Sequence, residues 1–124
     1  MRVLVAARDI RVRRALSRLL ELDGDQIVGA TDAPRLLPEL DAQVSPDLVV
    51  LELDRREHSQ DLLVVEELAR RGRAVIAVSS GSSLHAAALA AGARACLDKD
   101  AQFPDRLAEA VRAVAGPRLP APPA

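Results

Sequence analysis

The sequence predicts one α/β domain in which a parallel sheet is covered by helices on both faces. Five short apolar runs alternate with stretches of helical periodicity along about 115 residues. Each run is rich in β-branched or small residues and has almost no polar interruption, which is typical of strands that helices bury on both sides. A β-α unit repeated five times also favours right-handed crossovers and a single sheet.

The elements follow one another in a regular order. Strands are expected at 3–7, 27–30, 48–53, 74–79 and 95–97. Helices are expected between and after them, over about 12–20, 34–40, 62–71, 84–91 and 104–114. In the first helix Val12, Leu16 and Leu19 fall at i, i+4 and i+7 and define one apolar face. Pro34 suits a first helical turn, and Gly72 and Gly92 are helix stops.

Composition excludes several classes of function. The chain has 124 residues, 17 basic against 18 acidic, and a formal net charge of −1, so we expect no direct nucleic-acid contact. One Phe, no Trp and no Tyr argue against stacking on bases or sugars, and one Cys excludes an internal disulfide. No stretch approaches the roughly 20 apolar residues of a membrane span, and the run at 3–7 is too short for a signal peptide.

We therefore expect a soluble cytoplasmic domain over residues 1–115. Residues 116–124 hold four of the eight prolines and cannot continue a helix, so they are interpreted as a tail or a linker stub.

Four stretches resemble the receiver domains of bacterial response regulators. They are VLVAARDIRVRRALSRLLE (3–21), PDLVVLEL (46–53), VIAVSS (75–80) and AGARACLDKD (91–100). The last two, with the spacing among all four, look most like receivers of regulators that carry a helix-turn-helix. The resemblance implies a flavodoxin-like fold with strand order 2-1-3-4-5. It also implies a role in two-component signal transduction, the phosphorelay and transcription regulation.

The resemblance also places five functional positions at the carboxyl edge of the sheet, where ligands bind in such folds. Receivers carry there an acidic pair, a phosphoacceptor Asp, a hydroxyl residue and a lysine, and an aromatic switch residue stands three positions before the lysine. In this sequence the acidic-pair positions hold Ala7 and Arg8, the acceptor position Glu52, the hydroxyl position Ser79, the lysine position Lys99 and the aromatic position Cys96.

These substitutions change the chemistry that the resemblance implies. Glu52, Arg8 and Lys99 together carry +1, whereas three carboxylates and one lysine carry −2. At an assumed ~5 Å and an effective dielectric constant of ~20, Mg²⁺ and Arg8 would repel by about 7 kcal/mol. One carboxylate is also a poor ligand set for Mg²⁺. We therefore expect no metal, no cofactor, no phosphorylation of Glu52 and no enzymatic activity.

A phosphorylation-independent signalling module is the function that these residues favour. Arg8, Glu52 and Lys99 are expected to form an ion-paired cluster that stands in for metal and phosphate and holds one conformation, active-like or inactive-like. Alternatively, Glu52 and Lys99 pair loosely in solvent, contributing at most about 1 kcal/mol. Two other functions stay open: a conventional receiver with Asp54 as substitute acceptor, and a sensor of a small anionic ligand in the positive pocket.

The remaining candidates carry weaker signals. Cys96 is expected to be a core residue rather than a redox group, and His58 and His85 to be isolated and solvated. A face of the fourth helix, fifth strand and fifth helix is expected to contact a second copy or another signalling protein, unless it is simply solvated. Its residues are Leu84, Ala88, Asp98, Asp100, Arg106 and Arg112.

Overall fold

The sheet has the predicted doubly wound architecture. The computed structural model describes residues 1–116, and the expected tail beyond Gly116 lies outside the described residues. Five parallel strands pair in the order β2-β1-β3-β4-β5, the flavodoxin-like order. They are β1 (Arg2–Ala6), β2 (Gln26–Thr31), β3 (Leu48–Glu52), β4 (Ala74–Ser79) and β5 (Ala95–Asp98). Their bounds differ from the predicted ones by no more than one residue at either end.

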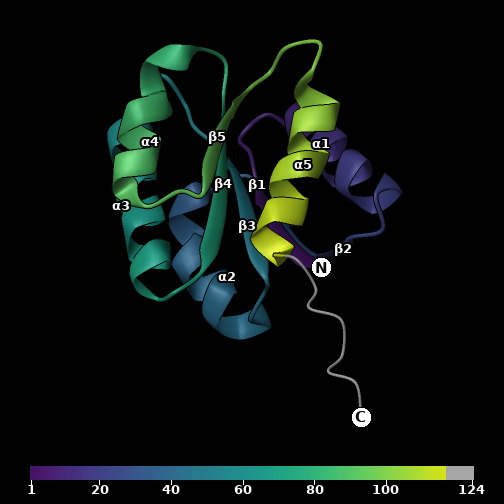
Figure 1. The fold of residues 1–124 in the computed structure, drawn as a ribbon. Helices are drawn as coiled ribbons and strands as arrows, with labels where there is room; N and C mark the ends of the chain where they lie inside the picture. Colours follow the sequence, from purple (N-terminus) through teal and green to yellow (C-terminus); the bar gives the residue numbers. More distant parts are fainter. Residues whose placement is uncertain (117–124) are drawn as a thin grey trace.

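Helices cover both faces of this sheet. They are α1 (Ile10–Leu22), α2 (Leu37–Val44), α3 (His58–Arg70), α4 (His85–Ala91) and α5 (Phe103–Ala115). Short 3₁₀ turns, Pro34–Leu36 and Ser82–Leu84, precede α2 and α4. Figure 1 shows α1 and α5 on one face and α2, α3 and α4 on the other. Within residues 1–116 no helix is both long and apolar enough to span a membrane.

Two hydrophobic cores follow from the alternation of side chains along each strand. In β1, Val3 and Val5 face the core under α1 and α5, whereas Leu4 and Ala6 face the core under α2, α3 and α4. All four are fully buried, and β3 and β4 alternate in the same way. This two-sided burial is why the strands are apolar at consecutive positions.

The junction of α3 and α4 is unusually close at one glycine. Gly92 ends α4 with φ +111°, a conformation that L side chains rarely adopt. A Cβ at this position would lie 2.6 Å from the Cβ of Ala69 in α3. Gly92 is therefore required both by its backbone angle and by its neighbour.

We expect Gly92→Ala to lower the free energy of unfolding by about 3 kcal/mol, because positive φ costs an L residue roughly 1–2 kcal/mol and the clash adds to it. Gly24→Ala is the matched control. Gly24 also has positive φ, +91°, but a Cβ there would meet nothing within 4 Å. Urea denaturation of both variants measures the difference. Equal losses would mean that α3 and α4 can move apart at no cost.

Candidate functional site

Five of the six predicted positions lie at the carboxyl edge of the sheet, which is the upper edge in Figure 1, whereas Cys96 lies inside β5 opposite Ala77. Strand register places them there: Ala6 pairs with Leu51, Glu52 with Val78, and Ser79 with Asp98. Ala7 and Arg8 follow β1, Glu52 ends β3, and Lys99 follows β5 directly.

Glu52 and Lys99 form one ion pair across this edge. Lys99 Nζ donates a hydrogen bond to Glu52 Oε2. The Glu52 side chain is only 14% exposed, so the carboxylate is largely removed from water. The backbone N–H of Lys99 also donates to the Ser79 carbonyl at 3.1 Å, which fixes the lysine beside β4. Lys99, which follows β5, therefore reaches across the end of β4 to the carboxylate of Glu52 at the end of β3.

Arg8 does not join this pair, so the predicted three-residue cluster is wrong. Its guanidinium donates two hydrogen bonds to Asp61, Nη1 to Oδ2 at 2.9 Å and Nη2 to Oδ1 at 2.8 Å. Nη2 also donates to Glu57 Oε2 at 3.2 Å, and Nη1 lies 3.9 Å from Asp54 Oδ2. The hydrogen bonds that Arg8 donates to Asp61, and the surrounding carboxylates, raise the pKa of Arg8 above its ordinary value, against the effect of burial. Arg8 is thus the centre of a second, separate cluster.

Asp61 is the residue that prediction from the sequence missed. It lies in the first turn of α3 and its side chain is 1% exposed. Besides the two bonds from Arg8, its Oδ2 accepts the backbone N–H of Asp54 at 3.0 Å. Asp61, Val65 and Leu68 lie at positions i, i+4 and i+7 on one buried face of α3. A carboxylate in line with two apolar residues of a helix is the sequence signal that could have identified Asp61.

The carboxylates around Arg8 also correct the predicted charge of the pocket. Arg8 and Lys99 face Asp54, Glu57, Asp61 and Glu52, so the two clusters together carry −2 rather than +1. Both cations already have partners, which removes the basis for a positive pocket.

The remaining site positions are apolar or satisfied within the fold. Ala7 is fully buried, and Ser79 Oγ donates to the Gly81 carbonyl at 2.7 Å. Cys96 is partly buried against the core under α2, α3 and α4, and burial raises the pKa of its thiol. This position favours the core interpretation of Cys96 over a redox role. Across residues 1–116 no three His, Cys, Asp or Glu side chains are placed to hold one metal ion.

The prediction of isolated, solvated histidines is wrong for His85, whereas His58 makes only a local contact at an exposed position. His85 Nε2, at the start of α4, lies 2.9 Å from Asp98 Oδ1 at the end of β5. His58 Nδ1 lies 3.0 Å from the Arg55 carbonyl. The His85–Asp98 contact joins α4 to β5 at the edge of the predicted partner face.

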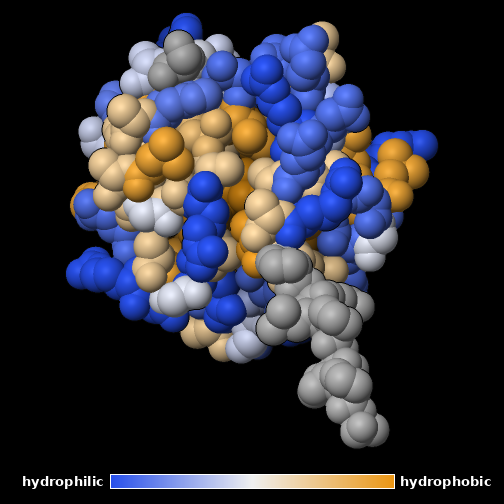
Figure 2. All heavy atoms as spheres, in the orientation of Figure 1, coloured by the Kyte–Doolittle hydropathy of each residue, from blue (hydrophilic) through white to orange (hydrophobic). Residues whose placement is uncertain are grey.

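That face is also composed differently from the prediction. Ala88 is fully buried in the core and is not part of the surface, whereas Leu89 is 51% exposed. Asp98 is engaged by His85, and Asp100 Oδ2 lies 3.6 Å from Arg106 Nη1. Figure 2 shows apolar side chains gathered over α4 and charged ones over α5.

We expect Arg8→Ala to lower the free energy of unfolding by about 2–4 kcal/mol, because Asp61 would remain buried without a cation. Asp61→Asn and the double variant complete a cycle, in which we expect a coupling energy of about 1–3 kcal/mol. The control is Arg11→Ala, which removes an exposed pair with Asp9 and should leave the free energy of unfolding nearly unchanged. Similar losses for Arg8 and Arg11 would contradict a structural role for the buried cluster.

Comparison with known proteins agrees with this geometry at the level of the fold. No family model and no curated protein matches the sequence. The signal receiver domain of the putative response regulator NarL from Mycobacterium tuberculosis is 24% identical, with 93% of this chain and 96% of that chain covered and a TM-score of 0.76. A DNA-binding response regulator of the LuxR family from Staphylococcus aureus is 20% identical, with 91% and 97% covered and a TM-score of 0.77.

A third similar structure has a different description. A putative pilus assembly-related protein from Burkholderia pseudomallei is 25% identical, with 93% of this chain and 89% of that chain covered and a TM-score of 0.75. Taken together, the strand order and these likenesses give the chain the flavodoxin-like fold of response regulator receiver domains.

Proposed function

We propose that this domain is a receiver-type signalling module whose conformation is held by ion pairs and not set by phosphorylation. The observation that carries the proposal is the guanidinium of Arg8, which lies among Asp54, Glu57 and Asp61 at the sheet edge. A fixed organic cation there does part of what a metal ion does in the receivers that this chain resembles: it links the end of β1 to the segment after β3.

The Arg8 link differs from a metal link in one respect that matters for signalling. A guanidinium stays charged at any physiological pH, and its bidentate bonds to one carboxylate define an orientation as well as a distance. Mg²⁺ would have to displace Arg8 from Asp61 and leave a buried carboxylate to be coordinated instead. The link through Arg8 is therefore permanent, whereas a link through metal and phosphate is reversible.

Glu52 is poorly placed for phosphoryl transfer. An attacking carboxylate needs a cation that neutralises the transferring phosphoryl group, and here the lysine that would assist is already bound to Glu52 itself. The pair of Glu52 and Lys99 resembles the contact between a phosphoryl group and lysine, but with one negative charge instead of nearly two.

Asp54 is the alternative phosphoryl acceptor, and its surroundings give this role little support. Its Oδ1 accepts the Arg56 backbone N–H at 2.6 Å, and this bond and the charge of Arg8 lower the pKa of the carboxyl. It lies in the loop after β3, two residues beyond the acceptor position. We treat it as an outcome of the experiment below.

The module would act by binding proteins in the cytoplasm, within transcription regulation. Support for this context comes from the similar structures, one a putative response regulator and one a DNA-binding response regulator. A surface for a second copy is offered by α4, where Leu89 and the exposed Ala86, Ala87 and Ala90 stand beside the mixed charges of Asp100 and Arg106. Apolar residues next to charges of both signs can be self-complementary about a twofold axis.

Incubation with acetyl phosphate and excess Mg²⁺, followed by intact mass measurement, tests the phosphorylation-independent function. We expect no phosphoryl adduct on the wild-type chain, under conditions in which a conventional receiver domain is fully modified. Glu52→Ala and Asp54→Ala are run beside it. A stoichiometric adduct that disappears in Glu52→Ala would overturn the proposal, and one that disappears only in Asp54→Ala would establish the alternative acceptor.

Sedimentation velocity tests the dimer separately. We expect the wild type to form a dimer at about 0.1 mM and Leu89→Asp to weaken it at least tenfold, because a buried charge without a partner is costly. Leu63→Asp is the matched control, since Leu63 is a leucine on α3 that is 63% exposed, against 51% for Leu89. A monomeric wild type, or equal dissociation by the two variants, would exclude this face as the dimer contact.

A further inference from the structure

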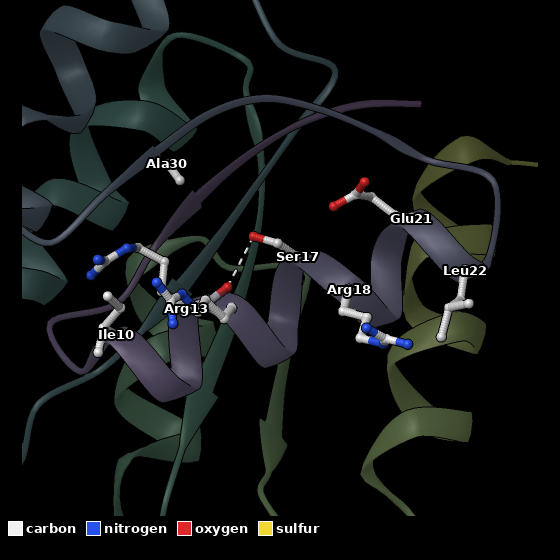
Figure 3. A pocket seen from close by; sticks show the side chains of 8 residues that line it. Ile10, Arg13, Ser17, Arg18, Glu21, Leu22 and Ala30 are labelled. Carbon is white, nitrogen blue, oxygen red and sulfur yellow. Dashed lines mark hydrogen bonds between the residues drawn. The ribbon is translucent and has the colours of Figure 1, made fainter.

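A pocket of about 430 Å³ opens between the segment after β2 and the first turns of α3. Its lining comes from three parts of the chain: Arg8 after β1, residues 32–35 and residues 57–64. Figure 3 shows a different, larger groove of about 710 Å³, in which every lining residue except Ala30 belongs to α1. That groove is the surface of one helix, whereas walls from three segments can enclose a ligand. Cavities of roughly 300–1,000 Å³ are typical of small-molecule sites.

Both walls of this pocket are fixed by contacts within the fold. On one side Thr31 Oγ1 accepts the backbone N–H of Ala33 at 3.1 Å, and the Ala33 carbonyl accepts the N–H of Leu36 at 2.9 Å. On the other side the buried carboxylate of Asp61 is held by two hydrogen bonds from Arg8. A ligand would therefore enter a preformed site and would lose little affinity to ordering of the backbone.

The pocket is polar at one end of its α3 wall and apolar at the other. Glu57, which precedes the first residue of α3, Asp61 and Val64 are spaced at i, i+4 and i+7, so they lie along one face. The distance along the helix from Glu57 to Val64 is about 10 Å. Leu63 lines the same apolar end and is 63% exposed. The wall thus suits a short molecule with a polar head and an aliphatic body.

Two opposite charges on the facing wall have no partner within the described part of the chain. Asp61 and Arg8 neutralise each other, and they need no further ligand. Asp32 and Arg35, three residues apart in the segment after β2, both line the pocket. Within residues 1–116 neither side chain forms an ion pair or a hydrogen bond. One carboxylate and one guanidinium are therefore available to a bound molecule.

We propose that this pocket binds a small aliphatic amino acid. Its ammonium group would pair with Asp32, its carboxylate would accept two hydrogen bonds from Arg35, and its aliphatic side chain would cover Leu63 and Val64. This site requires neither the pair of Glu52 and Lys99 nor the surface on α4. The proposal therefore goes beyond the proposed function, and each can fail without the other.

Other small ligands match the pocket less completely. Arg8 and Arg35 face Asp32, Glu57 and Asp61, so the lining carries −1 and disfavours a simple anion. Across residues 1–116 no three His, Cys, Asp or Glu side chains are placed to hold a metal ion. A diamine would bring a second cation to Arg35 or to the apolar end. A zwitterion with one aliphatic group uses both free charges and the apolar wall.

Titration of the ¹⁵N-labelled chain with L-leucine, followed by amide chemical shifts, tests the proposal. We expect saturable changes below about 10 mM ligand, confined to residues 31–36 and 57–64. Two analogues separate the charges: 3-methylbutylamine lacks the carboxylate and 4-methylpentanoate lacks the ammonium group. Each should bind about tenfold more weakly or worse, because it leaves one charged side chain without a partner. L-Serine keeps both charges without the aliphatic group and should bind several-fold more weakly.

Variants assign the binding to the named side chains. Asp32→Asn and Arg35→Gln should each weaken L-leucine binding about tenfold or more, and Leu63→Ser several-fold. Asp105→Asn and Arg94→Gln are the matched controls, since they make the same changes at exposed residues that do not line the pocket. They should leave the affinity within about twofold. Circular dichroism checks that every variant is folded.

Three results would overturn the proposal. The first is the absence of saturable shift changes with L-leucine, L-valine or L-methionine at about 10 mM. The second is equal loss of affinity in the pocket variants and the control variants, which would mean that the binding is nonspecific. The third is binding of either single-charge analogue as tightly as L-leucine, which would assign the pocket to an amine or to a carboxylate instead.

Discussion

The site depends on one electrostatic requirement, that the buried carboxylate of Asp61 must have a cation beside it. A charged group that is 1% exposed is costly to bury unless it is paired and hydrogen-bonded, and Arg8 supplies both conditions. Arg8 is turned towards Asp61 and forms no ion pair with Glu52, which pairs with Lys99 instead. The division of the sheet edge into two ion clusters therefore follows from the burial of a single side chain in the first turn of α3.

The fold could be predicted almost completely because it depends on the pattern of apolar residues along the sequence. A strand that is buried on both faces needs consecutive apolar residues, and runs such as 3–7 and 74–79 have the length and composition of such strands. Parallel topology then brings the strand ends to one edge, so the positions of Glu52, Ser79 and Lys99 could also be predicted. Those inferences depend on the backbone, which the hydrophobic pattern determines.

The pairing of side chains could not be predicted in the same way. Arginine is long enough to reach any of several carboxylates, and strand order alone does not say whether Arg8 turns towards Glu52 or towards Asp61. Helix rotation caused the second error. In α4 almost every residue is alanine, so hydropathy gives no contrast between its faces, and Ala88, expected on the surface, is fully buried.

Under the proposed function, ion pairs that stay intact change where regulation can enter the domain. If phosphorylation does not alter the clusters, a signal has to arrive through a bound partner, and the residues beside the Arg8 cluster become the place where binding could be sensed. The start of α1 is next to this cluster in the chain: Asp9 caps α1, and Arg13 Nη1 donates to the Ala7 carbonyl, one residue before Arg8. A partner bound at the start of α1 would therefore act on the same turn that positions Arg8.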